Sequence, residues 1–284
     1  MQAGPGVGLV CRPLEPYAAH LFTTRQWLLG SAGTSGARSD GWREVARAMD
    51  VAATHVVRLH QVHGSAHVVA GSPAEPDDTL PAADIVLTDR QDLAVAVQAA
   101  DCVPLLIADT GGRSAHQAQQ DHQGGSARVV AAAHAGWRGL VARVPERTVA
   151  ALGRERGSRP QDLIAVIGPS IGRCCYEVGL DVREQFAQAG FGEDALGRWF
   201  SSAPVPSARN PPMPGLSPTP RDRHWYFDGW LAARHELVAA GVPETSIYCA
   251  ELCTASHPTW LCSYRRDGSP AGRLAGAIRS RPRP

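Results

Sequence analysis

The stretch "DLAVAVQAADCVPLLIAD", residues 92–109, decides the fold class. It contains two runs rich in valine, leucine and isoleucine, and Asp101, Cys102 and Pro104 interrupt the apolar character between them. A strand that is apolar along its whole length has no solvent-facing side, so each run predicts a strand covered on both faces. We therefore expect a layered fold built around such strands.

The segments on either side alternate between strand-like and helix-like patterns. Further strands are predicted at 54–64, 83–89, 129–134, 162–172, 246–254 and 260–268. Helices are predicted at 41–50, 143–156, 181–190 and 227–241. Because this order is not a strict βαβ repeat, the expected fold class is α/β in the form of an α+β layered sandwich, with mixed sheets flanked by helices.

Domain organisation follows from length and from two polar segments. At 284 residues and 44% hydrophobic, the chain can bury a large core, and we expect one domain over residues 1–284. Residues 110–128 are polar and glycine-rich, and residues 201–224 hold seven prolines. Both segments are interpreted as inserted surface loops, and the proline-rich one as mobile with little contribution to the core.

Charge and hydropathy exclude several classes of partner. The net charge is +1 and the isoelectric point about 7.7, so nothing favours binding to nucleic acid or to a membrane surface. No apolar run approaches the roughly 20 residues that span a bilayer. The N-terminus lacks the pattern of a signal peptide, so we expect a cytoplasmic protein. The oligomeric state is left open.

The lysine and cysteine content excludes some types of catalysis and argues against disulfide bonds. All 28 basic residues are arginine, which excludes Schiff-base catalysis and the lysine of phosphate-binding P-loops. The seven cysteines are odd in number and irregularly spaced, so a disulfide framework is not expected.

Three residues lie where strand-like runs break at turn-forming residues: His63, Cys102 and His134. They are too far apart in sequence for a local zinc finger, so the fold would have to assemble them. One cysteine and two histidines suit Zn²⁺, and three protein ligands leave a fourth position for water. Spacing alone is weak evidence, because a chain with 11 histidines and 7 cysteines offers many such triplets. A lone histidine at a strand end more often has a structural role.

Several motifs occur in a fixed order: "HQVHG" (60–64), "ADCVPLLIAD" (100–109), "HAGWRG" (134–139), "IGPSIGRCCYEVG" (167–179) and "CSYRRDG" (262–268) with a following "GR". Together they resemble the laccase-domain or polyphenol oxidase family, which is also labelled bacterial purine nucleoside phosphorylase. Some of its members are called peptidoglycan editing factor. The resemblance runs from about residue 54 to the C-terminus, and "FTTR" (22–25) extends it.

The resemblance implies that His63, Cys102 and His134 bind zinc, and that Gly136 and Gly139 let the backbone pass close to a substrate. It further implies phosphorolysis of adenosine, inosine, guanosine and methylthioadenosine to a free base and ribose 1-phosphate, together with deamination of adenosine. The implied partners are therefore purine nucleosides and phosphate. For deamination, zinc would acidify a water molecule for attack on C6 of adenine.

Phosphate must be held by arginine or by backbone N–H groups, because the chain has no lysine. Arg138 is the favoured residue because it lies four positions from a proposed ligand, and its forked guanidinium suits phosphate. We therefore expect Cys102, His134 and Arg138 to be the catalytic residues. Arg265 and Arg266 could serve phosphate in the same way or could pair with surface carboxylates.

Three alternative functions remain. The first is a copper-binding polyphenol oxidase, although the chain lacks the His-x-His and His-Cys-His motifs of multicopper oxidases. The second is a metal-free hydrolase in which Cys102 is the nucleophile and His134 the base. The third is a non-catalytic or editing role in cell-wall synthesis.

Neighbouring residues receive mainly structural interpretations. His60 lies three positions before His63, on the opposite face of a strand, and is expected to be structural. Asp101 could orient a metal ligand or cap a turn. Cys174 and Cys175 are expected to pack or to shape a turn.

Three further residues complete the set. Tyr176 and Trp137 are interpreted as core residues, with stacking on a purine base as the alternative. Arg25 is assigned no role, because "QWLLGSAG" follows it where the family carries Gly-Gly-Val-Ser.

Overall fold

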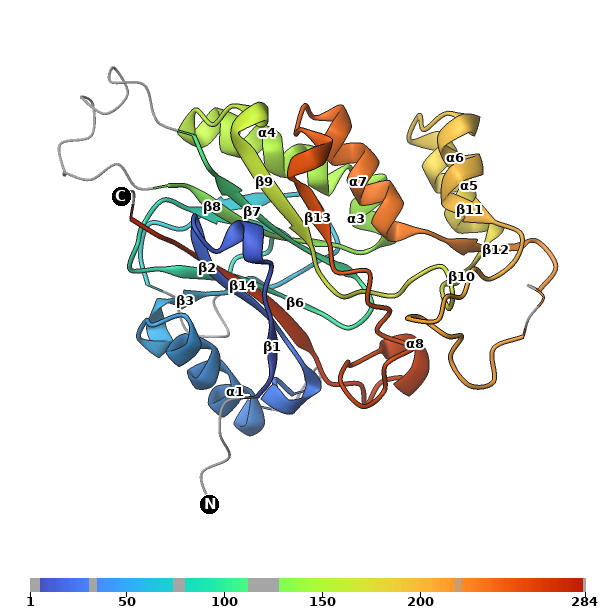
Figure 1. Ribbon diagram of the computed structural model, residues 1–284, viewed down its shortest axis with the longest axis horizontal. Coiled ribbons are helices and arrows are strands. Elements are labelled where there is room, and N and C mark those ends of the chain that lie inside the picture. The colour runs from blue at the N-terminus through green and yellow to red at the C-terminus, as the bar shows by residue number, and fades with distance from the viewer. Residues whose placement is uncertain are drawn as a thin grey trace.

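The computed structural model describes residues 6–30, 35–73, 80–111, 128–217, 219 and 221–282, with the backbone alone for 35–39. In these residues two large sheets stack face to face between layers of helices, as Figure 1 shows. The six-stranded sheet has the order β13 (Ile247–Cys249), β9 (Leu163–Ile167), β7 (Val103–Asp109), β8 (Val130–Ala135), β5 (Ile85–Thr88) and β4 (His67–Val69). The five-stranded sheet has the order β1 (Gly8–Leu9), β2 (Ala18–Thr23), β14 (Leu274–Ser280), β6 (Ala94–Ala99) and β3 (Val56–Val57).

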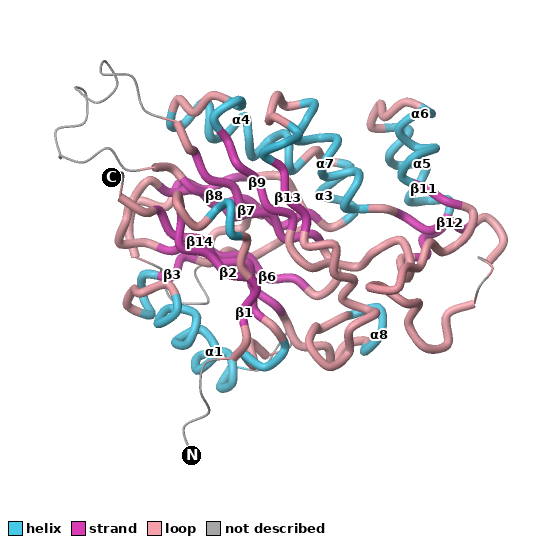
Figure 2. Tube along the Cα trace, viewed as in Figure 1, coloured by secondary structure: helices cyan, strands magenta, loops and turns pink. Residues whose placement is uncertain are grey.

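Helices cover the outer faces of both sheets, and a small third sheet lies at one end (Figure 2). That sheet has the order β10 (Glu177–Gly179), β12 (His224–Phe227) and β11 (Phe200–Ser201). The α-helices are α1 (Ser35–Ala48), α3 (Trp137–Val141), α4 (Val144–Arg156), α5 (Leu180–Gln188), α6 (Glu193–Trp199), α7 (Gly229–Ala239) and α8 (Tyr264–Asp267). Short 3₁₀ turns occupy Arg12–Leu14, Arg25–Trp27, Ala53–His55, Pro160–Asp162 and Glu244–Ser246. None of the helices described is long and apolar enough to cross a bilayer.

Strand β6 explains why the opening stretch has no polar face. Val95 and Val97 point into the core between the two sheets, whereas Ala94 and Ala96 point into the core beneath α1. Successive side chains of a strand alternate between faces, so a strand between two cores is apolar throughout. The predicted layered α/β fold with mixed sheets is confirmed, since parallel and antiparallel pairs occur in both large sheets.

The polar interruption at 100–102 marks the passage of the chain from one sheet to the other. Strand β6 belongs to the five-stranded sheet and β7 to the six-stranded sheet. Asp101 takes a left-handed backbone conformation there, with φ of 93°. Cys102 therefore lies at the mouth of the sandwich, where two layers meet.

Local signals at the helix ends match the structure. Helix α4 has Pro145 in its first turn, where a missing N–H costs nothing, and Gly157 ends it at φ of 69°. Helix α7 begins after Asp228, whose carboxylate accepts a hydrogen bond from the N–H of Leu231. The predicted helices at 41–50, 143–156, 181–190 and 227–241 are present.

Two predicted strands are wrong. In 54–64 only Val56–Val57 form a strand, because the N–H groups of residues 62–64 bind the Asp84 carboxylate instead of a neighbouring strand. In 260–268 the chain forms helix α8, whose first turn is capped by the Ser263 hydroxyl. Conversely, the sequence patterns predicted no strand at the positions of β2 and β14, although β14 lies at the centre of its sheet.

The two predicted loops differ in what the structure describes. Residues 112–127 lie outside the described residues. Most of 201–217 is irregular and exposed, but Asn210 is buried, donating to the Glu251 carbonyl and accepting from the N–H of Cys253. Asn210 therefore ties this segment to the chain around Glu251 and Cys253.

Candidate metal centre

The three predicted ligands converge. The potential ligand atoms of His63, Cys102 and His134 all lie within 4.8 Å of one another. His63 Nε2 is 3.8 Å from Cys102 Sγ, and the two imidazole rings meet edge to face with centroids 4.8 Å apart. The predicted convergence is therefore observed, and metal binding itself remains a prediction.

Three different elements supply these side chains. His63 lies in the irregular segment after β3, in a left-handed conformation with φ of 58°. Cys102 comes from the crossover between the sheets, and His134 from β8. His134 is buried and Cys102 half-buried, whereas His63 is exposed. A small molecule could reach the group from the side of His63.

Asp84 holds this arrangement together, and the sequence analysis missed it. Its buried carboxylate accepts a hydrogen bond from His134 Nδ1 at 2.8 Å. It also accepts from the backbone N–H groups of His63 at 3.1 Å and Gly64 at 2.6 Å. Its place at the start of the apolar run in "ADIVLTD" marks it as a polar residue beside a strand but does not identify its contacts. Asp84 thus engages Nδ1 of His134, so that Nε2 is the nitrogen that could bind a metal, and it fixes the backbone position of His63.

The titration behaviour of the group reflects these contacts. Burial raises the pKa of the Asp84 carboxyl, but the hydrogen bonds from His134 and Gly64 outweigh it and lower that pKa. Burial also opposes ionisation of Cys102 and His134, yet their mutual attraction lowers the pKa of Cys102 to about 6 and raises that of His134 to about 9. At neutral pH the metal-free pair is therefore a thiolate and an imidazolium. The thiolate is the form that binds metal, whereas His134 would release its Nε2 proton when a metal binds.

Gly136 is required by the closeness of the ligands. A Cβ atom there would lie 2.9 Å from Cys102 Sγ and 3.1 Å from His63 Cδ2. Gly139 instead faces the interior, where a Cβ would lie 3.2 Å from Val144 Cγ2. Of the two glycines, Gly136 is thus the one that shapes the centre.

Arg138 and Arg265 carry positive charge near Tyr176. Burial raises the pKa of the Tyr176 hydroxyl, with Cys102 and Asp101 adding to the rise and Arg265 and Arg138 opposing it. The backbones of both arginines lie near Cys102: the N–H of Arg265 donates to Asp101, and Arg138 follows Gly136, which approaches the Cys102 sulfur. Arg265 lies over the Tyr176 ring at 5.2 Å.

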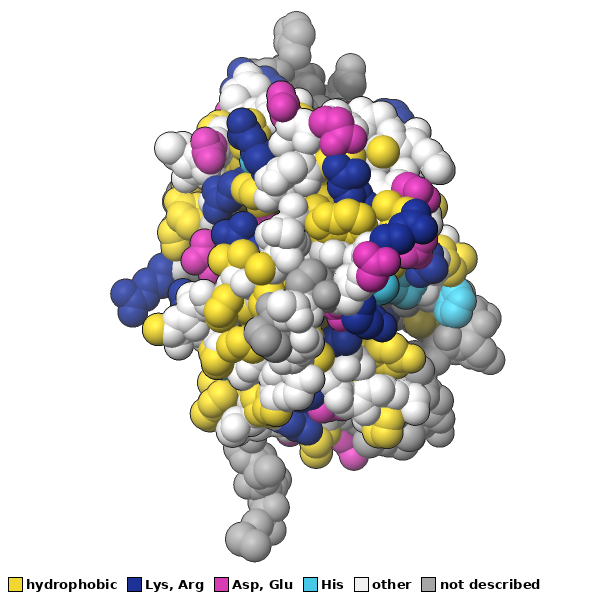
Figure 3. Space-filling view, turned by 90° about the vertical axis from the view of Figure 1, so that its right-hand side faces the viewer, with side chains coloured by type: hydrophobic (Ala, Val, Ile, Leu, Met, Phe, Trp, Pro, Cys, Tyr) yellow, Lys and Arg dark blue, Asp and Glu magenta, His cyan; other side chains and the backbone are white. Residues whose placement is uncertain are grey.

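Arg138 is exposed on α3, with its guanidinium carbon 4.4 Å from the centre of the Trp137 ring. No ion pair between described residues includes Arg138, which leaves its N–H groups available to an anion. Figure 3 shows that basic, acidic and apolar side chains are interspersed on the face it draws, with histidine exposed beside arginine.

Two residues with open interpretations have structural contacts. Asp101 accepts from the Thr254 hydroxyl and from the backbone N–H of Arg265 at 2.6 Å, so it caps the start of α8. Arg266 donates to the carbonyl groups of Thr254 and Leu261 and pairs with Asp267. The guanidinium of Arg266 is fully engaged, whereas that of Arg265 donates to the Glu177 carbonyl at 2.7 Å.

The remaining residues lie outside the centre. His60 is exposed, and its backbone pairs with the segment around Ala82. Arg25 donates to the Pro258 and Trp260 segment, through its side chain and its backbone respectively. Tyr176 and Trp137 both pack against the core and are partly buried.

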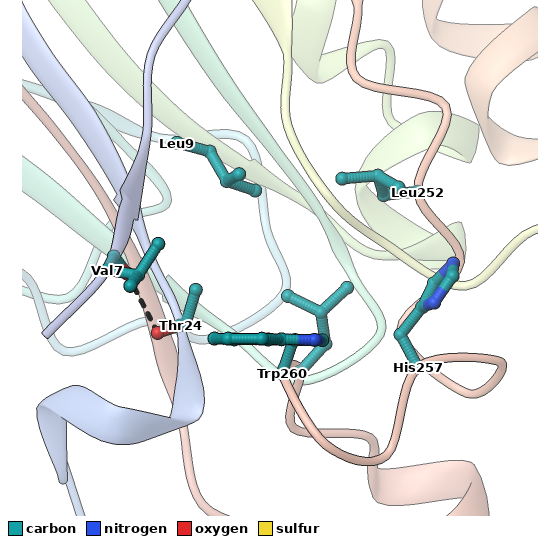
Figure 4. A pocket seen from close by; sticks show the side chains of 7 residues that line it. Val7, Leu9, Thr24, Leu252, His257 and Trp260 are labelled. Carbon is teal, nitrogen blue, oxygen red and sulfur yellow. Dashed lines mark hydrogen bonds between the residues drawn. The ribbon is translucent and has the colours of Figure 1, made fainter.

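An apolar cavity of about 270 Å³ lies beside the Arg25 segment. Figure 4 shows Val7, Leu9 and Thr24 on one side, the Trp260 ring below them, and Leu252 and His257 opposite. None of the three proposed metal ligands lines it.

Cys174 and Cys175 are buried in a small apolar cluster, which agrees with the packing interpretation. Cys253 joins them there, and the three sulfur atoms lie within 4.8 Å of one another. No sequence motif links Cys253 to Cys174 and Cys175.

The fold and the site define a layered α/β protein with a candidate mononuclear Cys/His metal centre. A family profile described as multi-copper polyphenol oxidoreductase laccase matches residues 37–281. The chain belongs to this laccase-domain family, as the sequence resemblance indicated.

Relatives and solved structures agree with this membership. Purine nucleoside phosphorylase from Deinococcus radiodurans is 32% identical over 285 residues, covering 96% of this chain and 93% of that protein. Adenosine deaminase RL5, from an unknown prokaryotic organism, is 31% identical over 204 residues, covering 72% and 64%. The crystal structure of the hypothetical protein YfiH from Bacillus licheniformis has the same fold, with a TM-score of 0.74 at 23% identity over 99% of this chain and 98% of that one.

Proposed function

We propose that this protein is a zinc-dependent purine nucleoside phosphorylase that accepts adenosine, inosine, guanosine and methylthioadenosine, with adenosine deamination as a second activity. The observation that carries the proposal is the convergence of His63, Cys102 and His134 on one another, oriented by Asp84. The names of the relatives from Deinococcus radiodurans and of RL5 support the two activities.

The donor set fits zinc. One thiolate and two imidazoles are ligands that Zn²⁺ prefers, and three of them leave a position open for a substrate or water. Asp84 supplies the carboxylate behind a ligating histidine that is typical of zinc sites. The close approach of Gly136 keeps the space beside the ligands small. A zinc ion held there would supply Lewis acidity to the reaction.

The protein's own residues would perform the remaining tasks. Arg138 and Arg265, whose backbones lie near Cys102, would bind the phosphate oxygens through their guanidinium groups. The exposed side of His63 would admit the nucleoside. The Tyr176 hydroxyl stays protonated because burial raises its pKa, so it can donate a hydrogen bond to the substrate.

A copper oxidase is the less favoured function for this centre. Oxidases with several coppers need many histidine ligands, and in the described residues a single group of potential ligands contains histidine. A metal-free thiol hydrolase would use the same Cys102 thiolate and His134, so geometry does not separate it from the zinc enzyme. Metal dependence does.

The test is product analysis with purified protein of known zinc content. Inosine with phosphate should yield hypoxanthine and ribose 1-phosphate, and omission of phosphate should stop release of the base. Adenosine without phosphate should yield inosine if deamination is intrinsic. Zinc at one equivalent per chain with no turnover of any nucleoside would overturn the enzymatic proposal.

Matched variants assign the activity to the centre. His63→Ala should lose both zinc and turnover, whereas His60→Ala, three positions away and exposed, should lose neither. Arg138→Ala should raise KM for phosphate more than KM for inosine, because it removes an anion contact. Equal behaviour of the two histidine variants would contradict the assignment.

A further inference from the structure

A second group of soft ligands lies outside the Cys/His centre. Cys174, Cys175 and Cys253 are free thiols whose side chains are at most 2% exposed. Their sulfur atoms lie within 4.8 Å of one another. The proposed reaction uses none of them.

The strand arrangement brings these cysteines together. Strands β9 and β13 run parallel, so the chain leaves both at the same edge of the six-stranded sheet. Ser170, beyond β9, then pairs with Cys253, beyond β13, in an isolated bridge. The turn that follows Ser170 carries Cys174 and Cys175 back over Cys253. The cluster is therefore fixed by main-chain pairing as well as by side-chain packing.

The main chain directs hydrogen-bond donors at the sulfur atoms. The N–H of Gly172 donates to Cys253 Sγ at 3.3 Å, and the N–H of Met213 donates to Cys175 Sγ at 3.2 Å. Ser256 Oγ lies 3.5 Å from each sulfur of the adjacent pair. Apolar packing of three thiols does not require N–H donors aimed at sulfur, whereas thiolates that hold a metal are commonly stabilised in this way.

The residues around the three cysteines are mostly apolar and buried. Ile171 and Ala255 are buried in the same cluster, and Met213, Tyr176 and Trp230 pack against it. A cation there would meet three sulfur atoms, hydrocarbon and the Ser256 hydroxyl, with no carboxylate or imidazole among the ligands that the described residues place in this group. Such a site disfavours hard cations, which require oxygen ligands.

We propose that Cys174, Cys175 and Cys253 form a structural site for monovalent copper, bound by three thiolates. Cysteine thiolates select Cu(I) and zinc among the available cations. Zinc in structural sites takes four ligands in a tetrahedron, and this group offers three. Binding would release the thiol protons to solvent and would change no oxidation state.

The experiment uses the full-length Cys102→Ala chain, so that the first centre lacks its thiolate. Cu(I) is titrated without oxygen against a chromophoric Cu(I) chelator. We expect one equivalent per chain, a thiolate-to-copper charge-transfer band in the ultraviolet, and an X-ray absorption spectrum with sulfur alone around copper. No binding in competition with the chelator, nitrogen around copper, or displacement of copper by one equivalent of zinc would overturn the proposal.

A matched pair of variants locates the copper. In the same background, Cys253→Ser should weaken Cu(I) binding by at least about 100-fold, since it removes a ligand. Cys249→Ser, on β13 and outside the cluster, should leave binding unchanged. If Cys253→Ser does not fold, as judged by near-ultraviolet circular dichroism, Cys174→Ser takes its place. Equal affinity for the serine variants would contradict the site.

Discussion

At the scale of single residues, Asp84 controls the candidate metal centre without belonging to its ligand set. Its carboxylate is fully buried and accepts hydrogen bonds from the His134 imidazole and from the backbone N–H of His63. Asp84→Asn keeps the size of the side chain but removes the charge that holds His134. We expect zinc affinity to fall about 10- to 100-fold, the range typical of carboxylates behind metal ligands. Competition with a zinc chelator measures it.

The control for that variant is a carboxylate of similar burial. Asp109 lies at the end of β7, whereas Cys102 lies just before the start of that strand. Its carboxylate accepts hydrogen bonds from the Ser158 hydroxyl and the N–H of Gly111, and from none of the three predicted ligands. Asp109→Asn should therefore destabilise the protein without lowering its zinc content. If both variants lost zinc equally, general destabilisation would explain the result, and the role of Asp84 would fail.

Gly136 provides a second test at this scale. A methyl group at this position overlaps the Cys102 sulfur and the His63 ring, so Gly136→Ala should displace one of them. Misplacement by about 1 Å can cost roughly 100-fold in rate, and a loss of that order in kcat/KM for inosine is expected. Gly197→Ala is the control, because a Cβ there meets nothing within 4 Å. Unchanged activity of Gly136→Ala would contradict the described packing.

At the scale of elements, helix α7 carries an unusual acid. Glu236 is buried, and neither carboxylate oxygen has a hydrogen-bond partner among the described residues. Burial raises its pKa well above the ordinary value, with Glu146 adding to the rise and Arg143 opposing it. The folded protein therefore keeps a proton on Glu236 at pH values where the unfolded chain has released it. Stability is full below the unfolded pKa and falls as pH rises above it.

The slope of that fall is fixed by linkage. While the folded chain holds one proton more, the free energy of unfolding decreases by about 1.4 kcal/mol per pH unit. Glu236→Gln removes the ionisation, so urea denaturation should show a shallower decrease between pH 5 and pH 8 than in the parent protein. Glu244→Gln, exposed after the same helix, should leave the slope unchanged. Parallel curves for the parent protein and Glu236→Gln would show that this carboxyl does not titrate as described.

The elements also show where sequence patterns were sufficient. Helix α4 was predictable because Pro145, Gly157 and an apolar face mark its start, its end and its buried side. Helix α8 was predicted as a strand, because "WLCSYRRDG" has strand-like apolar residues and its helical start depends on a cap from the distant Asp101. A four-residue helix has too little length to show periodicity, so its contacts decide its structure.

At the scale of the whole molecule, the sequence predicted a layered fold with buried strands, but not which strands belong to which sheet. The apolar character of 92–109 indicated strands covered on both faces, and the structure has them. Nothing in that stretch indicated that its two halves lie in different sheets, because both sheets are buried alike. Strand β14 was missed for a related reason: "LAGAIRS" is rich in alanine and glycine, and its central place depends on pairing with β2 and β6.

In the candidate site, too, some residues could be identified from the sequence and others only from the structure. His63, Cys102 and His134 could be named from motifs, and the fold brings them together. Asp84 and Cys253 could not, because each acts through contacts with residues that are remote in sequence. Ligand types are visible in a sequence, whereas the residues that position them depend on the register of the strands.

The central claim is that Cys102 serves as a metal ligand on which nucleoside phosphorolysis depends, and its alkylation rate tests that claim most directly. The rate is measured by peptide mass spectrometry at pH 7.5, with and without a zinc chelator, alongside phosphate-dependent release of hypoxanthine from inosine. Because the pKa of Cys102 is lowered to about 6 in the metal-free chain, removal of the metal exposes a thiolate. We predict slow alkylation with metal, and fast alkylation with loss of activity in chelator. Fast alkylation of the metal-loaded protein, or full activity in chelator, would contradict the account.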